Sequence, residues 1–324
     1  MFKLIQSLFG INTGGDYPEA LIDEAIERCV DGTDPWIRGV SGYRKKLRPA
    51  VVSAIDYVIK LVDALPDPVH MDPTLYSDDH LMKCFFISAA DMRTVLAGDR
   101  SLAKFMQKAD EDLPADIYAL LAMEKQERGG FGVALSGDIV IHDVPQVTVS
   151  FDSHHLLDPS AVLKEHRLLL KHRAFDHLVH LALKQLAWLK SERSDLERRR
   201  KLLQSKQSLL QRYGWGFVTG CTDERSDGST IENDLEEIEA HLNKLGGDDC
   251  VLDKYLETVS SLLGSPEKYL KGARETIYVD RMGIKRDGPS DGALELSLTM
   301  LYSAEGTSIV SLPVVIRSTE LQGL

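Results

Sequence analysis

The chain has 324 residues, a formal net charge of −12, and 43% hydrophobic residues. This length suits two or three structural units, and the apolar content is ordinary for a globular protein with a core. Because nucleic-acid binding relies on a positive surface, the acidic balance argues against nucleic acid and favours protein partners. No run approaches the roughly 18 apolar residues that a membrane-spanning helix needs.

The N-terminal third predicts a small helical domain, residues 1–112. Its first segment can place much of its apolar content on one side of a short helix, through Phe2, Leu4, Ile5, Leu8 and Phe9. Membrane-surface anchors look similar but usually carry more basic residues than the single Lys3 found here. Docking of this segment on its own domain or on another copy is therefore the favoured interpretation.

Residues 36–48 form the most basic stretch of the N-terminal half and also contain aromatic side chains. Arg38, Arg44 and Arg48 are candidates for contact with an anion or an acidic partner. The alternative, which we favour, is that they are surface charges around a packed aromatic residue.

Two separated sections of the chain predict β-strands. Residues 131–136, 138–144 and 146–152 are short and rich in Val and Ile, which indicates an antiparallel meander. A strand is also expected over residues 275–286, and residues 294–302 and 310–316 alternate apolar with other side chains. Since neither section has enough strands to be comfortably stable alone, we expect both to join in one antiparallel domain, residues 113–152 plus 274–318.

Between these sections lies a heptad pattern, in which apolar residues recur every seven positions at Leu168, Phe175, Ala182, Leu189, Leu196, Leu203 and Leu210. Such spacing is typical of a coiled coil. Ser229 and Glu232 then form a capping box that starts a second helical section, which Gly246 and Gly247 interrupt. We predict that residues 153–273 form an inserted, antiparallel coiled-coil hairpin with a tip loop at residues 213–229.

The two arms of this predicted hairpin carry opposite charges. Residues 198–201 are basic on the first arm, and Glu232, Asp234 and Glu236 begin an acidic run on the second. Flanking charges of opposite sign help to set the partner and orientation in a coiled coil. The heptad positions that face the partner helix form a seam, which becomes half polar along the first arm through Arg193, Arg200 and Gln207. This half-polar seam also allows self-association along the hairpin.

Aromatic residues gather in the tip loop, where Tyr213, Trp215 and Phe217 lie beside Cys221. Large apolar side chains on such a loop are costly unless they pack together or meet a partner. Local packing is slightly favoured, but these three residues are the best candidates for a partner-binding site.

The sequence contains no strong metal or cofactor motif. His177 and His180, three residues apart on a helix, are weak metal candidates, because a site would need another ligand from elsewhere. The four cysteines Cys29, Cys84, Cys221 and Cys250 show no C-x-x-C spacing, which favours a reduced, cytoplasmic protein without cofactor.

These patterns together predict an α+β fold: a helical N-terminal domain, an antiparallel sheet from two separated sections, and a coiled-coil hairpin insertion. Because no catalytic motif is present, the predicted function is that of a non-enzymatic scaffold or adaptor with a protein partner or a second copy. One alternative is an enzyme with a site between the helical and β domains, using residues such as Arg38, Arg44 or His142. The other is nucleic-acid binding through residues 198–201.

Overall fold

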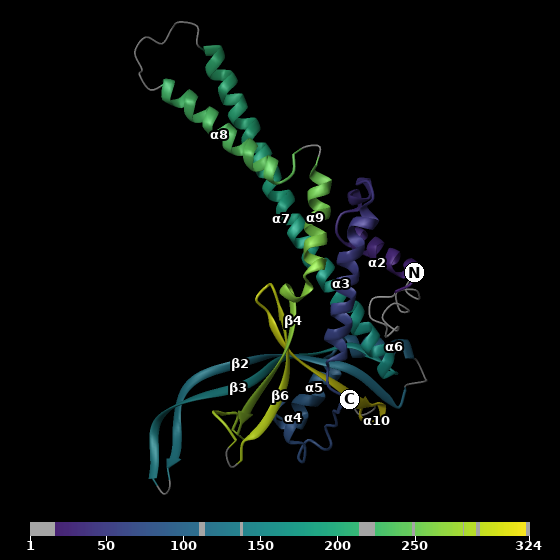
Figure 1. Ribbon diagram of the computed structural model, residues 1–324. Helices are drawn as coiled ribbons and strands as arrows, with labels where there is room; N and C mark the ends of the chain where they lie inside the picture. The colour runs from purple at the N-terminus through teal and green to yellow at the C-terminus, as the bar shows by residue number, and fades with distance from the viewer. Residues whose placement is uncertain are drawn as a thin grey trace. The chain divides into compact units, whose positions relative to one another are not determined.

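The computed structural model describes residues 17–109, 114–136, 139–213, 224–247, 250–280, 282–289 and 292–321 (Figure 1). Of the described residues 56% are helical and 28% are in strands, so the predicted α+β class is confirmed. By internal contacts the chain divides into two compact units. The helical unit takes residues up to Ala54 and Asp176–Pro266, and the sheet unit takes Ile55–Phe175 and residues from Glu267 onward. The predicted division into residues 1–112, 113–152 plus 274–318, and 153–273 stays a prediction.

The helical unit is built from amphipathic helices. Its elements are α2 (Glu19–Gly32), η1 (Pro35–Gly39), the first part of α3 (Tyr43–Asp63), most of α7 (Leu163–Tyr213), α8 (Glu224–Lys244) and α9 (Val251–Gly264). Helix α2 buries one side at helical spacing, through Leu21, Ile22, Ala25, Ile26, Cys29 and Val30. Burial in this core raises the pKa of the Cys29 thiol and keeps it neutral.

The end of α2 packs tightly against α7. A Cβ atom added at Gly32 would lie 2.6 Å from Val179 Cγ1, a distance that real side chains do not adopt. Glycine therefore leaves room for the Val179 side chain against the backbone of α2 at this position.

The sheet unit contains the strands β1 (Val69–His70), β2 (Asp116–Ser136), β3 (Ile139–Ser160), β4 (Leu270–Val279), β5 (Lys285–Arg286), β6 (Leu294–Ser303) and β7 (Ser308–Arg317). Their order is β3-β2-β7-β6-β4-β5, and β1 pairs in parallel with β7, whereas the other pairings are antiparallel. Strand β2 pairs with β7 over Asp116–Met123. The prediction that the two separated β sections share one sheet is thus confirmed.

The first β section differs from the predicted meander of short strands. Strands β2 and β3 form one long hairpin of 21 and 22 residues. The turn-like residues around Asp143 lie within β3, because Asp143 adopts a φ of 59° and the register shifts opposite it, as in a β-bulge. Strand β3 also continues to Ser160, which pairs with Tyr118.

The sheet curls until its outer strands meet. Thr148 of β3 bridges Ile284, and the Val149 amide donates to the Gly283 carbonyl at 2.7 Å. The core lies between the sheet and the helices α4 (His80–Phe85), α5 (Ala89–Gly98) and α6 (Arg100–Ala109). Within it the rings of Phe85 and Phe151 meet edge to face, with centroids 4.9 Å apart.

The remaining short elements attach to this sheet. The second half of α3 approaches β4, where the Tyr57 hydroxyl donates to the Leu270 carbonyl at 2.6 Å. The helix η2 (Pro266–Lys268) precedes β4, and α10 (Ser318–Leu321) follows β7. No helix in the described ranges is long and apolar enough to cross a membrane. The predicted amphipathic segment at residues 2–9 lies outside the described residues.

His154 of β3 is held in a half-buried site of the sheet unit. Its Nε2 contacts the Phe85 carbonyl at 2.8 Å, and its ring stacks on Phe86 with centroids 4.6 Å apart. Burial lowers the pKa of His154 below its usual value. The unfolded chain therefore binds more protons than the folded chain as the pH falls below about 6.5.

We expect His154 to make the protein less stable as the pH falls. The contribution of His154 to the free energy of unfolding is fully present at a pH above its unfolded-state pKa. It is lost as the pH falls from there through the lower folded-state pKa. Urea unfolding at about pH 7.5 and about pH 5.5 measures the loss of stability, and H154Q should lose less than the parent protein. Equal losses in the two proteins would show that the titration of His154 does not contribute.

Candidate functional site

The predicted partner-binding loop falls largely outside the described structure. Tyr213 is the last residue of α7, and its side chain, together with Trp215 and Phe217, lies outside the described part of the chain. Partner binding by this loop stays a prediction.

The three candidate arginines near α3 are brought to the acidic side of α2. Arg38 Nη2 lies 2.8 Å from Glu27 Oε2, Arg44 Nη2 lies 2.9 Å from Glu27 Oε1, and Arg48 Nη1 lies 2.9 Å from Glu19 Oε1. Although burial alone raises the pKa of Glu27, hydrogen bonds from Tyr43, Arg38 and Arg44 hold it below the usual value. These internal pairs support the surface-charge interpretation, and contact with an external anion stays a prediction.

The candidate histidines do not form a ligand set. His177 is half-buried and His180 is exposed on α7, while His142 is exposed on β3. Among the described residues, no group of three or more His, Cys, Asp or Glu side chains is placed to hold a metal ion.

The helices α8 and α9 contact α7 in succession, and both run opposite to it (Figure 1). Glu192 Oε1 of α7 lies 3.3 Å from His241 Nε2 of α8, and Arg193 donates to the Gly246 carbonyl just beyond α8. Farther back along α7, the ammonium of Lys190 lies 5.3 Å from the ring centroid of Tyr255 in α9. Gly246, with a φ of 98°, supplies the backbone conformation that separates α8 from α9.

A polar layer occupies the middle of α7. Lys190 Nζ lies 2.6 Å from the buried carboxylate of Asp34, which also accepts the Trp36 amide that starts η1. One turn on, Arg193 pairs with Glu197 at 2.8 Å. The ion pair of Lys190 with Asp34 thus joins the long helix to its neighbour here, and that of Arg193 with Glu197 lies within α7. The preceding turns of α7 instead bury apolar residues, namely Leu178, Val179, Leu181, Ala182 and Leu186.

A second side of α7 carries exposed apolar residues. Trp188 and Leu202 are each 64% exposed, and Leu209 is 52% exposed. Trp188 and Leu202 are fourteen residues apart, and Leu202 and Leu209 are seven apart, so the three share one side of the helix. We call these three residues the apolar stripe. A shallow groove of about 320 Å³ runs along this side, lined by α7 residues alone: Trp188, Ser191, Glu192, Asp195, Leu196 and Arg199.

Sequence reasoning missed this stripe because it followed only the stronger heptad beside it. The available signal was the same seven-residue spacing through Trp188, Leu202 and Leu209, with Asp195 at the intervening position.

The opposite charges of α7 and α8 do not pair with each other in the described structure. Arg198 pairs instead with Asp195 on its own helix. The acidic residues of α8 are exposed, namely Glu232, Asp234, Glu236, Glu237 and Glu239. Within the described segments, no ion pair joins them to residues 198–201, so the expected charge pairing inside the hairpin is absent there.

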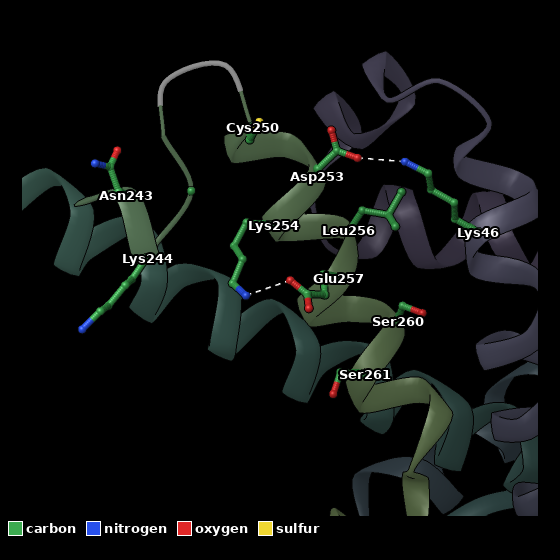
Figure 2. Close-up of a pocket in the computed structure, with 11 residues that line it drawn as sticks. Lys46, Asn243, Lys244, Cys250, Asp253, Lys254, Leu256, Glu257, Ser260 and Ser261 are labelled. Carbon is green, nitrogen blue, oxygen red and sulfur yellow. Dashed lines mark hydrogen bonds and ion pairs between the residues drawn. The ribbon is translucent and has the colours of Figure 1, made fainter. Parts of the chain in front are cut away.

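A larger open groove of about 710 Å³ lies beside the break between α8 and α9 (Figure 2). Its charged side chains largely neutralise one another, since Lys46 pairs with Asp253 at 2.8 Å and Lys254 with Glu257 at 2.7 Å. Cys250 lies at its rim with an exposed thiol. The sequence did not indicate this groove because its walls come from separated segments.

Comparisons of the chain with known protein families, with curated proteins and with solved structures found no match. The function is therefore argued from the described residues themselves.

Proposed function

We propose that the chain is a non-enzymatic protein–protein interaction protein, a scaffold or adaptor, in which α7 pairs with α8 and α9 as a coiled-coil hairpin. This hairpin is its interaction or self-association arm. The observation that carries the proposal is the apolar stripe of Trp188, Leu202 and Leu209, which is exposed along α7. Large apolar and aromatic side chains gathered on one surface are typical of sites that bind another protein.

The contacts along α7 support the coiled-coil part of this proposal. The seam residue Arg193 of α7 contacts Gly246, and the adjacent Glu192 contacts His241, on a neighbour that runs in the opposite direction. On α8, the apolar positions of Ile231, Ile238 and Leu242 are buried. Their seven- and four-residue spacing places them along one seam. The cytoplasmic location predicted from the cysteines belongs to the same proposal.

The proposal predicts that polar replacement of the apolar stripe weakens association without unfolding the protein. In the variant W188S/L202S/L209S, self-association or partner binding should weaken about tenfold or more, as for the loss of an aromatic anchor at an interface. The melting temperature should change little because these side chains are exposed in the free chain. Light scattering over a range of concentrations measures self-association, and quantitative co-purification measures other partners.

The matched control removes equally exposed apolar residues from the sheet unit. Phe131, Val133 and Met282 are exposed there, so F131S/V133S/M282S should keep the association of the parent protein. The proposal fails if the stripe variant associates as the parent does, or if the control variant alone loses association.

A further inference from the structure

The hairpin displays two surfaces of opposite charge. We define the basic surface as residues 198–201 of α7 and the acidic surface as Glu232, Asp234, Glu236, Glu237 and Glu239 of α8. The contacts of Glu192 with His241 and of Arg193 with Gly246 set the register between the helices. Because both helices rise equally per residue, continuing from these contacts brings the basic surface level with the acidic one.

These surfaces are available to another molecule. The side chains of Arg198, Arg199 and Lys201 are exposed, and within the described segments the only ion pair of the basic surface is the one between Arg198 and Asp195. The acidic surface is exposed throughout its five residues. Because the side chains are exposed and no ion pair joins the two surfaces within the described segments, both can contact another molecule.

The apolar stripe lies along the same stretch of α7. Leu202 directly follows the basic surface, and Trp188 and Leu209 lie to either side of it along the helix. Apolar residues flanked by charged ones are the usual composition of a protein–protein interface, in which the charges set register and exclude wrong partners.

We propose that this surface binds the hairpin of a second copy of the chain, with the basic surface of each copy against the acidic surface of the other. The inference rests on the proposed function of the hairpin as an interaction arm. A two-fold axis parallel to the hairpins would place the same height of each copy side by side. The basic surface of each copy would then meet the acidic surface of the other, and the two contacts would form together. Nucleic acid fits less well, because the acidic surface lies level with the basic one and the chain has a net charge of −12.

Charge reversal tests the reciprocity of this contact. One variant, R198E/R199E/K201E, makes both surfaces acidic, and the other, E232K/E236K/E239K, makes both basic. Each alone should self-associate about tenfold more weakly than the parent, because like charges face each other across the two-fold axis. An equimolar mixture should regain association as a mixed dimer, because each contact then joins opposite charges.

The control is the fold of each variant, measured by circular dichroism and thermal unfolding. Exposed substitutions should leave both nearly unchanged. The inference is overturned if either variant alone self-associates as the parent does, if the mixture does not associate, or if the parent chain is a monomer at every concentration. If W188S/L202S/L209S loses association while the charge reversals do not, the hairpin remains an interaction arm and only the reciprocal pairing is wrong.

Discussion

Replacement of Phe151 by alanine is expected to lower the free energy of unfolding of the sheet unit by about 3–5 kcal/mol. Phe151 is 6% exposed and lies in the core between the curled sheet and the helices α4–α6. Its ring meets that of Phe85 edge to face. Truncation would remove both the buried apolar surface and this ring contact, and it would leave a cavity that the surrounding strands can fill only in part.

A matched control lies on the same hairpin. Phe131 of β2 is 79% exposed, so F131A should change the free energy of unfolding by no more than about 0.5 kcal/mol. Urea unfolding of both variants, compared with the parent at the same pH, measures the difference. Similar losses in the two variants would contradict the described placement of Phe131 outside the core and Phe151 inside it.

The second large effect is expected at a buried lysine. The side chain of Lys171 in α7 is 7% exposed, and its ammonium lies 2.8 Å from Asp63 Oδ1 at the end of α3. Asp63→Ala would leave this ammonium without the carboxylate that it contacts. Because the Asp63 side chain is 39% exposed, water can take over part of the lost contact, and we expect a loss of about 1–2 kcal/mol.

Removing the buried charge itself should have a much smaller effect. The Lys171→Met substitution keeps most of the apolar stem of the side chain, and replacing a buried charge in this way is often neutral or stabilising. The double variant D63A/K171M should therefore recover most of the stability lost in D63A, as measured by a double-mutant cycle in urea. A loss in the double variant as large as in D63A would show that the apolar contacts of Asp63, and not the charge of Lys171, cause the destabilisation.

The union of the two β sections could be predicted from the sequence, because neither section has enough strands to be stable alone and the alternating strands have a face that must be buried. The long β2–β3 hairpin was not predicted from sequence. Asp143, Val144 and Pro145 resemble a turn, yet the structure accommodates them within β3 by a bulge. Local residue preferences do not distinguish these outcomes, because the choice depends on pairing with residues of β2 that are distant in sequence.

For the candidate site, the heptad spacing drew attention to the long helix α7, whose coiled-coil pairing stays a proposal. The α7 residues that contact its neighbours include Arg193 of the half-polar seam. Sequence reasoning could not predict that Arg38, Arg44 and Arg48 meet carboxylates of α2, since that depends on how the two helices pack. For the same reason, the opposite charges of α7 and α8 looked like partners in the sequence. In the described structure no ion pair joins them.

The most direct test of the hairpin as an interaction arm is site-specific photo-cross-linking. A photo-reactive benzophenone amino acid would replace Leu202 in the full chain, and in a control protein it would replace Phe131, which is also exposed. We predict a covalent product between position 202 and a second chain after irradiation in cells, with no such product from position 131. A product from position 131 alone would contradict the account and place the interaction surface on the β2–β3 hairpin instead.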